Sequence, residues 1–190
     1  MRKFLLASAS PRRRELLGLV LPEFTVRVSA ADEILEERNP RKLVEELAHR
    51  KAEAVARRAE KGAVVIGADT VVYADGEILG KPQNRADARR MLQILSGSTH
   101  AVYTGICVID AETGQTRRDA AKTEVVMAEI SKAELEDYLD TEEYADKAGA
   151  YGIQGKMARW IIGIHGCYYN VMGLPVQKLY ALLRDMQLMG

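Results

Sequence analysis

Apolar runs and amphipathic stretches alternate along the whole chain. Short apolar runs with alternating polar positions are typical of β-strands, whereas apolar residues spaced by three and four are typical of α-helices. This alternation predicts α/β or α+β layering around one central sheet. We expect strands at residues 3–7, 23–28, 63–73, 77–79, 99–110, 115–130 and 158–164, and helices at residues 11–17, 40–61, 85–96, 132–140 and from 175 onward.

Several predicted helices begin after a residue whose side chain can cap the first turn. Ser10 and Asn39 each precede a proline, which favours the first helical position, and Ser131 forms a capping box with Glu134. In the helix after Asn39, an apolar stripe at spacings of three and four is interrupted by Lys51. Lys51 either extends to the rim of the helix or reaches a buried phosphate.

The composition narrows the range of partners. The 190 residues are 47% hydrophobic and 28% charged, and 27 Lys and Arg balance 27 Asp and Glu. A neutral chain has no global field to hold nucleic acid, so a small molecule is the favoured partner. Cys107 and Cys167 show neither disulfide nor zinc spacing, and no apolar run approaches the roughly 18 residues of a membrane span. We expect a single domain, residues 1–190, in the cytoplasm, without nucleic-acid or membrane partners.

Asp69 is the most unusual residue, because it interrupts an apolar run at residues 64–73 that we expect to be covered on both faces. Burying a carboxylate without compensation costs several kcal/mol. In a structural role, backbone amides or a buried cation would compensate it; in a functional role, it would bind a divalent metal or act as a general base. Gly67 and Ala68 are small enough to let a ligand approach the backbone.

The dipeptide Asp75-Gly76 predicts a two-residue hairpin turn. In that register Lys81 lies opposite Thr70, one residue away from Asp69 and on the other face of the sheet. A bulge at Gly80 would bring Lys81 and Asp69 to the same face.

A second cluster lies at residues 8–14, where a predicted strand leads through small residues into the first turn of a helix. Helix N-termini favour anions, and Arg12, Arg13 and Arg14 would be unfavourable there unless an anion is bound. The pattern predicts a phosphate site. The other interpretation is a solvated basic turn that Glu15 partly neutralises.

The glycine-rich stretch 148–156 is not a phosphate-binding P-loop, because its spacing differs and Met157 replaces Ser or Thr. It can instead be a loop that presents Gln154, whose amide suits the edge of a nucleobase. No G-x-S-x-G occurs. A basic anion site, one buried acid, the acidic pair Asp32 and Glu33 and two isolated lysines favour hydrolysis of a nucleotide or another phosphate ester.

These residues stand in ordered motifs that closely resemble the Maf family of nucleoside triphosphate pyrophosphatases. The resemblance covers nearly the whole chain, and chance is a poor explanation for so many motifs in order. The motifs lie at residues 5–13, which include the S-x-x-R signature, and at 67–70, 80–82, 95–97, 147–155 and 173–175.

The resemblance implies an α/β fold with a central mixed, largely antiparallel sheet flanked by helices, and two lobes around a deep cleft, as in ITPase-like proteins. It also implies a homodimer. The implied reaction is cleavage between the α and β phosphates of a nucleoside triphosphate to give the monophosphate and pyrophosphate. The implied cofactor is a divalent cation such as Mg²⁺, Mn²⁺ or Co²⁺.

The family pattern also implies roles for single residues. Asp69 would accept a proton from the attacking water and contact the metal, while Glu33 would support the metal or the water. Phosphate contacts are implied for Ser8, Arg12, Lys51 and Lys81. Base selectivity is implied for Arg13, Thr70 and Gln154, and this set resembles the dTTP/UTP branch rather than the 7-methyl-GTP branch, which tends to carry Trp, Gln and Glu.

Two other functions stay open at this point. One is a pyrophosphatase for 7-methyl-GTP or for deaminated purines such as ITP. The other is a non-catalytic nucleotide sensor that affects cell division, in which loss of Asp69 would leave function intact.

Overall fold

The computed structural model of the chain describes residues 2–29, 31 and 36–189. Its helices and strands are β1 (Lys3–Leu6), α1 (Pro11–Gly18), β2 (Thr25–Val26), α2 (Pro40–Ala56), β3 (Ala63–Ala74), β4 (Glu77–Leu79), α3 (Arg85–Leu95), β5 (Thr99–Asp110), β6 (Thr116–Met127), α4 (Lys132–Leu139), β7 (Ile161–His165), α5 (Tyr168–Met172) and α6 (Val176–Asp185). Two 3-10 helices, η1 (Ala148–Ala150) and η2 (Lys156–Trp160), precede β7. Within the described residues, no helix has the length and apolar character needed to cross a bilayer.

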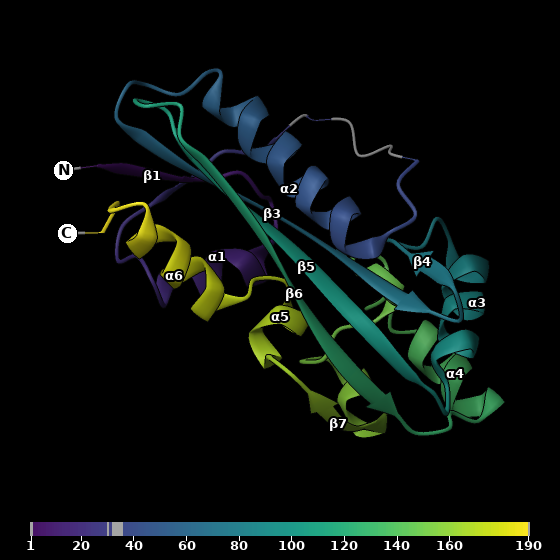
Figure 1. The fold of residues 1–190 in the computed structure, drawn as a ribbon. Helices are drawn as coiled ribbons and strands as arrows, with labels where there is room; N and C mark the ends of the chain where they lie inside the picture. Colours follow the sequence, from purple (N-terminus) through teal and green to yellow (C-terminus); the bar gives the residue numbers. More distant parts are fainter. Residues whose placement is uncertain (1, 30, 32–35, 190) are drawn as a thin grey trace. The chain divides into compact units, whose positions relative to one another are not determined.

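The strands form one sheet in the order β2-β1-β3-β5-β6-β7, with β4 paired to β3 (Figure 1). β1 pairs in parallel with both β2 and β3, and the intervening helices α1 and α2 supply the crossovers that parallel strands need. β4 is antiparallel to β3, and β7 is antiparallel to β6. The predicted fold class, a mixed sheet flanked by helices, is therefore confirmed.

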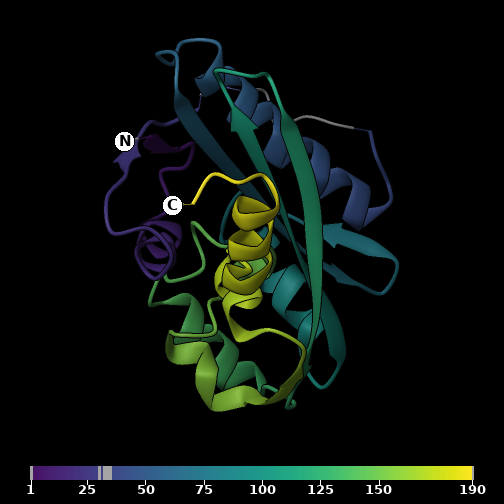
Figure 2. The ribbon, with the colours of Figure 1, turned by 60° about the vertical axis from the view of Figure 1, so that its left-hand side comes forward.

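The described chain forms two compact units, and three strands contribute residues to both. The first unit contains Met1–Asp69, Thr104–Ala121 and Gly173–Gly190, and the second contains Thr70–Tyr103 and Lys122–Met172. In the first unit, α2 covers one face of the sheet and α6 the other (Figures 1 and 2). The expected deep cleft and the single domain over residues 1–190 stay predictions.

Two glycines let α2 lie unusually close to the sheet in the first unit. A Cβ at Gly67 of β3 would stand 2.2 Å from the carbonyl oxygen of Ala48, and one at Gly105 of β5 would stand 2.1 Å from that of Val44. Both distances are far below van der Waals contact, so only glycine fits. The interface is otherwise apolar, and its buried residues are Leu5, Ala7, Ala48, Ala52, Val55, Ala63, Val65, Cys107 and Ile109.

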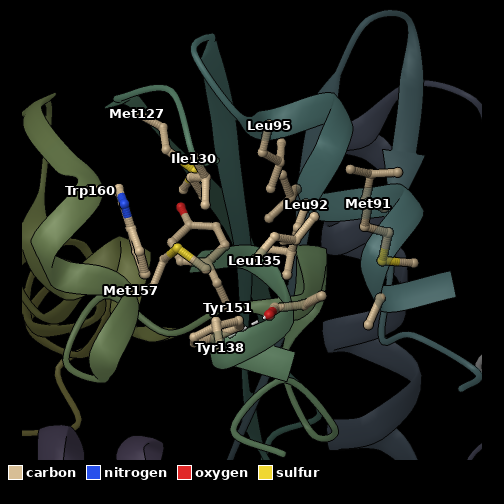
Figure 3. Close-up of a cluster of buried hydrophobic side chains, with 14 of the residues drawn as sticks. Met91, Leu92, Leu95, Met127, Ile130, Leu135, Tyr138, Tyr151, Met157 and Trp160 are labelled. Carbon is tan, nitrogen blue, oxygen red and sulfur yellow. Dashed lines mark hydrogen bonds between the residues drawn. The ribbon is translucent and has the colours of Figure 1, made fainter. Parts of the chain in front are cut away.

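The second unit has a core of its own (Figure 3). Side chains of α3 and α4 pack there against the segment that leads into β7, and the fully buried Tyr138, Leu92, Leu95 and Met157 are among the largest. Each such side chain contributes about 1.5–3 kcal/mol on burial. Tyr138 and Trp160 meet edge to face, with ring centroids 6.5 Å apart.

The structure corrects several element boundaries. The strand expected at residues 23–28 is reduced to Thr25–Val26, and the helix expected to reach residue 61 ends at Ala56. Residues 158–160 form the end of η2 rather than the start of a strand, and α5 was not expected. The error at residues 158–160 arises because apolar content alone does not distinguish a short buried 3-10 turn from a strand.

The predicted helix caps are confirmed. Ser10 accepts a hydrogen bond from the backbone of Arg13, and Asn39 accepts one from that of Lys42. Ser131 and Glu134 form the full capping box. Such caps satisfy amides that the first helical turn leaves without partners, which is why these residue types mark helix starts in a sequence.

Candidate active site

Asp69 is the last residue of β3 that belongs to the first unit. Lys51 of α2 donates a hydrogen bond to its Oδ1 atom. Both side chains are nearly buried, with exposed fractions of 11% for Asp69 and 13% for Lys51. A buried ion pair compensates much of the desolvation of each charge, whereas either charge alone would be strongly destabilising. The compensating group for Asp69 is thus a buried cation.

The close packing of α2 on β3 explains how these residues meet. Residues 63, 65, 67 and 69 of β3 face α2, because side chains alternate along a strand. Gly67 contacts the backbone of Ala48 and Ala52, so the helix passes directly over it. Helical side chains lean toward the helix N-terminus, which directs the long Lys51 side chain from its position beside Ala52 toward Asp69.

This arrangement bears on two predictions, the space for a ligand at Gly67 and the direction of the Lys51 side chain. Gly67 does not make room for a ligand; the space above it is filled by the backbone of α2. Lys51 does not extend to the rim of its helix, because it turns inward to the carboxylate of Asp69. A phosphate contact by Lys51 stays a prediction.

Ser8 lies two residues beyond the carboxyl end of β1, just past the point where the parallel β1–β3 pairing ends. Its side-chain oxygen accepts hydrogen bonds from the backbone of Ser10 at 3.2 Å and from Nη1 of Arg13 at 3.3 Å. A hydroxyl has two acceptor lone pairs and one donor hydrogen. The Ser8 hydroxyl therefore has its donor left for another acceptor, such as a phosphate oxygen.

Arg13 is held in place from the far end of the chain. Its Nε atom donates to the carbonyl oxygen of Gly173 at 2.8 Å, a contact between residues 160 positions apart. Gly173 has a φ of 114°, which favours glycine. Arg12, which also lies within the motif at residues 5–13, is in the first turn of α1 and is half-buried. α1 has no acidic residue in its first turn to offset the positive end of its dipole.

A pocket of about 780 Å³ adjoins these residues in the first unit. Ser8 and Ser10 line it, together with Arg14 of α1 and residues 22–24. Glu15 and Glu23 also line it, so the pocket carries both signs of charge. Asp69 and Lys51 are not among its lining residues.

The second unit carries the other predicted site residues. Thr70 is half-buried on β3 and points to the face opposite Asp69, because successive strand residues alternate. The predicted hairpin register is confirmed, with Val72 opposite Leu79 and Tyr73 opposite Ile78. β4 ends at Leu79, however, and no bulge follows in that ladder.

Lys81 and Gln154 are both exposed in the second unit, and their segments are joined by a backbone hydrogen bond. The amide of Gly149 donates to the carbonyl oxygen of Gly80 at 3.0 Å. Gly80 was the expected site of a bulge in the strand ladder. Its carbonyl instead joins the segment that carries Lys81 to the glycine-rich stretch 148–156.

The predicted metal ligands can be assessed only in part. Glu33, together with Asp32, lies outside the described residues. Among the residues that the structure describes, no three His, Cys, Asp or Glu side chains gather to hold a metal by themselves. Asp69 offers carboxylate oxygens, and Mg²⁺ is usually bound by one or two carboxylates together with substrate phosphates. The donor set fits a metal shared with the substrate.

Three residues near these groups were given no role from the sequence. Gly173 anchors Arg13, and His100 and Tyr151 form a buried pair beneath the glycine-rich loop, with His100 Nε2 2.7 Å from the Tyr151 hydroxyl. Burial lowers the pKa of His100 to about 4 and raises the pKa of Tyr151. The sequence signal that could have indicated a role for His100 is a polar residue at a position of the predicted strand 99–110 that faces inward.

Comparison with known proteins gives the same family over nearly the whole chain. The model of the family described as Maf-like protein matches residues 3–186. The chain is 50% identical over 184 residues to a dTTP/UTP pyrophosphatase of Alkaliphilus metalliredigens, which covers 96% of this chain and 95% of that protein. It is also 50% identical over 185 residues to a dTTP/UTP pyrophosphatase of Desulforamulus reducens, covering 97% and 96%.

A solved structure shares the fold. The HAM1 protein from Coxiella burnetii superposes with a TM-score of 0.55, covering 97% of this chain and 100% of that one. The sequence identity is only 15%, so this likeness concerns the fold alone. With its motifs in order and a family match that leaves out only a few terminal residues, the chain belongs to the family of Maf-like proteins.

Proposed function

We propose that this chain is a nucleoside triphosphate pyrophosphatase that hydrolyses dTTP and UTP to the nucleoside monophosphate and pyrophosphate. The observation that carries the proposal is its 50% identity, over at least 95% of both chains, to proteins named dTTP/UTP pyrophosphatase. The geometry around Asp69 and Ser8 makes this chemistry intelligible.

Asp69 is the proposed general base. A water molecule attacks phosphorus at the α–β phosphoanhydride, its proton passes to the Asp69 carboxylate, and pyrophosphate leaves with the electrons of the broken P–O bond. The ion pair with Lys51 keeps a carboxylate available in a nearly water-free position. Lys51, whose ammonium lies beside this carboxylate, is also a proposed phosphate ligand.

The first turn of α1 is the proposed phosphate site. The Ser8 hydroxyl has its donor available, and Arg12, Arg13 and the helix N-terminus add positive charge. Preorganised donors of this kind stabilise the charge that develops on phosphate oxygens without reorganising during the reaction. Lys81 is a further proposed phosphate ligand.

Asp69 would also hold a divalent cation, with Glu33 as the proposed second carboxylate. Bound there, Mg²⁺, Mn²⁺ or Co²⁺ would neutralise phosphate charge and lower the pKa of a coordinated water. Proton acceptance by Asp69 and the proposed phosphate contacts of Ser8 and Arg12 need only side chains of this chain.

Gln154 is the proposed base-recognition residue, with Arg13 and Thr70 as further determinants of selectivity. Its amide supplies both a donor and an acceptor, which complements the imide edge shared by uracil and thymine. Homodimerisation and a cytoplasmic location stay predictions of the family resemblance.

A substrate panel with pyrophosphate detection tests the proposal. Wild type, Asp69→Asn and Asp119→Asn are each assayed with UTP, dTTP, CTP, ITP and 7-methyl-GTP, with and without Mg²⁺. Asp119 is the control, because it is also an acid paired with a lysine, Lys178, and it is half-buried on another part of the first unit.

We expect UTP and dTTP to be the best substrates, and Asp69→Asn to lose about 10²–10⁴-fold in kcat. Asp119→Asn should keep most of its turnover. Preference for 7-methyl-GTP or ITP would replace the substrate assignment, and full turnover by Asp69→Asn would remove its role as base. Binding of UTP without turnover by wild type would favour the sensor.

A further inference from the structure

Gln154 sits at the tip of a tight turn whose two ends are both anchored. The amide of Gly155 donates to the carbonyl oxygen of Gly152 at 3.1 Å, which closes the turn around Ile153 and Gln154. Gln154 itself is exposed. The direction of its side chain therefore depends on how the segments on either side of the turn are held.

The segment before the turn is anchored by Tyr151. Its side chain is buried in the core of the second unit (Figure 3), and its hydroxyl lies 2.7 Å from Nε2 of His100 on β5. The two rings meet edge to face at an angle of 85°. Just before it, the hydroxyl of Tyr138 donates to the carbonyl oxygen of Ala150 at 3.2 Å. Ala150 has a φ of 63°, which this anchoring maintains.

The segment after the turn is anchored by Glu143. Its Oε2 atom accepts a hydrogen bond from the backbone of Lys156 at 2.9 Å. A Cβ at Gly155 would stand 2.3 Å from that oxygen, so glycine is needed for the carboxylate to approach. The turn is thus clamped within four residues of its tip on both sides.

The polar character of the His100–Tyr151 pair calls for an explanation, since Phe or Leu would fill the same space. His100 is only 2% exposed, and its Nδ1 atom has no hydrogen-bond partner among the described residues. An orphaned buried nitrogen is destabilising. Burial keeps the imidazole neutral, with a pKa of about 4, so the contact with Tyr151 is a hydrogen bond between neutral groups. What the pair adds over apolar packing is direction, because a hydrogen bond holds the Tyr151 ring at one rotation and depth.

We propose that His100 and Tyr151 are positioning residues for nucleobase selectivity, whose hydrogen bond holds the Gly152–Gly155 turn so that Gln154 faces the base edge. This inference rests on the proposed function, and it extends that function to two residues that do not touch the substrate. The preferred base is a pyrimidine with an imide edge, as in UTP, over one with an amino group, as in CTP.

The kinetic test measures kcat and KM for UTP and CTP in wild type, His100→Phe, Tyr151→Phe and His100→Gln. We expect His100→Phe and Tyr151→Phe to lower the ratio of UTP to CTP specificity constants about three- to tenfold, mainly through KM. His100→Gln introduces a side-chain amide that can replace the imidazole as hydrogen-bond partner of the Tyr151 hydroxyl, so this variant should keep part of the ratio. An unchanged ratio in both Phe variants would overturn the proposal.

A double-mutant cycle with Gln154→Ala separates positioning from general damage. In the Gln154→Ala background, Tyr151→Phe should lower the ratio no further, because both changes act on the same contact. Thr123→Val is the matched control: Thr123 is a fully buried hydroxyl in the same unit that bonds the backbone of Cys167 instead of the loop. Its stability should fall while its UTP to CTP ratio stays at the wild-type value.

Hydrogen exchange tests the clamp without any substrate. The amides of residues 152–156 should exchange about three- to tenfold faster in Tyr151→Phe than in wild type, while those of α6 stay unchanged. Equal exchange in residues 152–156 would overturn the clamp even if UTP is the substrate. If wild type does not turn over UTP or dTTP, the proposed function fails, and the exchange result alone decides whether the pair holds the turn.

Discussion

Lys51 of α2 and Asp69 of β3 form an ion pair that is almost wholly removed from solvent, directly beside the glycine at which the helix touches the strand. The pair joins two requirements in one place. The fold needs a cation to compensate a buried carboxylate, and the proposed reaction needs a carboxylate held next to a cation. The same contact therefore serves both stability and chemistry.

Breaking this pair from the lysine side should be more destabilising than removing both charges. We expect Lys51→Met to lower the free energy of unfolding by about 3–5 kcal/mol, because Asp69 is then buried without its partner. The double variant Lys51→Met/Asp69→Asn should recover a large part of that loss. Urea denaturation of both single variants and the double variant measures the coupling.

The control for this cycle is Lys42→Met, on the exposed side of the same helix, which should change stability by no more than about 0.5 kcal/mol. Strictly additive effects of Lys51→Met and Asp69→Asn would mean that the two side chains are independent in solution.

Gly67→Ala should destabilise the protein by about 3 kcal/mol or more, because the new methyl group would collide with the Ala48 carbonyl and push α2 from the sheet. Displacement of α2 would also separate Lys51 from Asp69, so activity should fall with stability. Gly163→Ala is the matched control in a strand, since a Cβ there meets no described atom within 4 Å. Thermal unfolding of both variants gives the comparison, and equal Tm values would contradict the packing argument.

Ser8 and Ser10 should respond differently to alanine. Ser10 caps α1, so Ser10→Ala should lower stability by about 1 kcal/mol with a smaller effect on turnover. Ser8→Ala removes the proposed phosphate donor and should raise KM for UTP about tenfold. Urea denaturation and steady-state kinetics on both variants distinguish the two tasks. The assignment of Ser8 would be wrong if Ser8→Ala bound and cleaved UTP as wild type does.

His100 should make stability depend on pH in a definite direction. Its pKa is about 4 in the folded protein and 6.5 when unfolded, so between these values the unfolded chain binds a proton that the folded chain does not. Stability therefore falls as the pH decreases through this window and is unaffected by His100 above it. Between about pH 7.5 and about pH 4.5 the loss attributable to His100 is about 2.5 kcal/mol.

The measurement compares wild type with His100→Gln by denaturation at both pH values. Wild type should lose more stability than the variant on acidification. His49, whose pKa is also lowered by burial and by Arg118, is present in both proteins and cancels in the difference. Parallel losses in the two proteins would show that His100 is protonated without hindrance in the folded state.

The two thiols should differ sharply in reactivity. Cys107 is fully buried between α2 and the sheet, and burial raises its pKa to about 12, whereas Cys167 is partly exposed. Because the thiolate is the reactive form, a thiol reagent at about pH 8 should label one residue per native chain. Cys167→Ala should abolish this labelling, and denaturation should expose the second thiol. Rapid labelling of native Cys167→Ala would contradict the burial of Cys107.

Sequence reasoning located most of the local structure and the main candidate residues. Helix starts at Ser10, Asn39 and Ser131 and the Asp75-Gly76 hairpin could be predicted, because caps and turns depend on residues at most a few positions apart. The burial of Asp69 was also predictable, since an apolar strand surrounds it. Where the local pattern was ambiguous, as at residues 158–160, the prediction was wrong.

The tertiary structure alone decided which of these residues meet. Lys51 is the partner of Asp69 over 18 positions, His100 that of Tyr151 over 51, and Gly173 that of Arg13 over 160. Gly67, interpreted from the sequence as space for a ligand, is instead the point where α2 contacts the sheet. Composition and spacing report the preferences of neighbouring residues, whereas these pairs depend on how helices pack on strands, which no local pattern encodes.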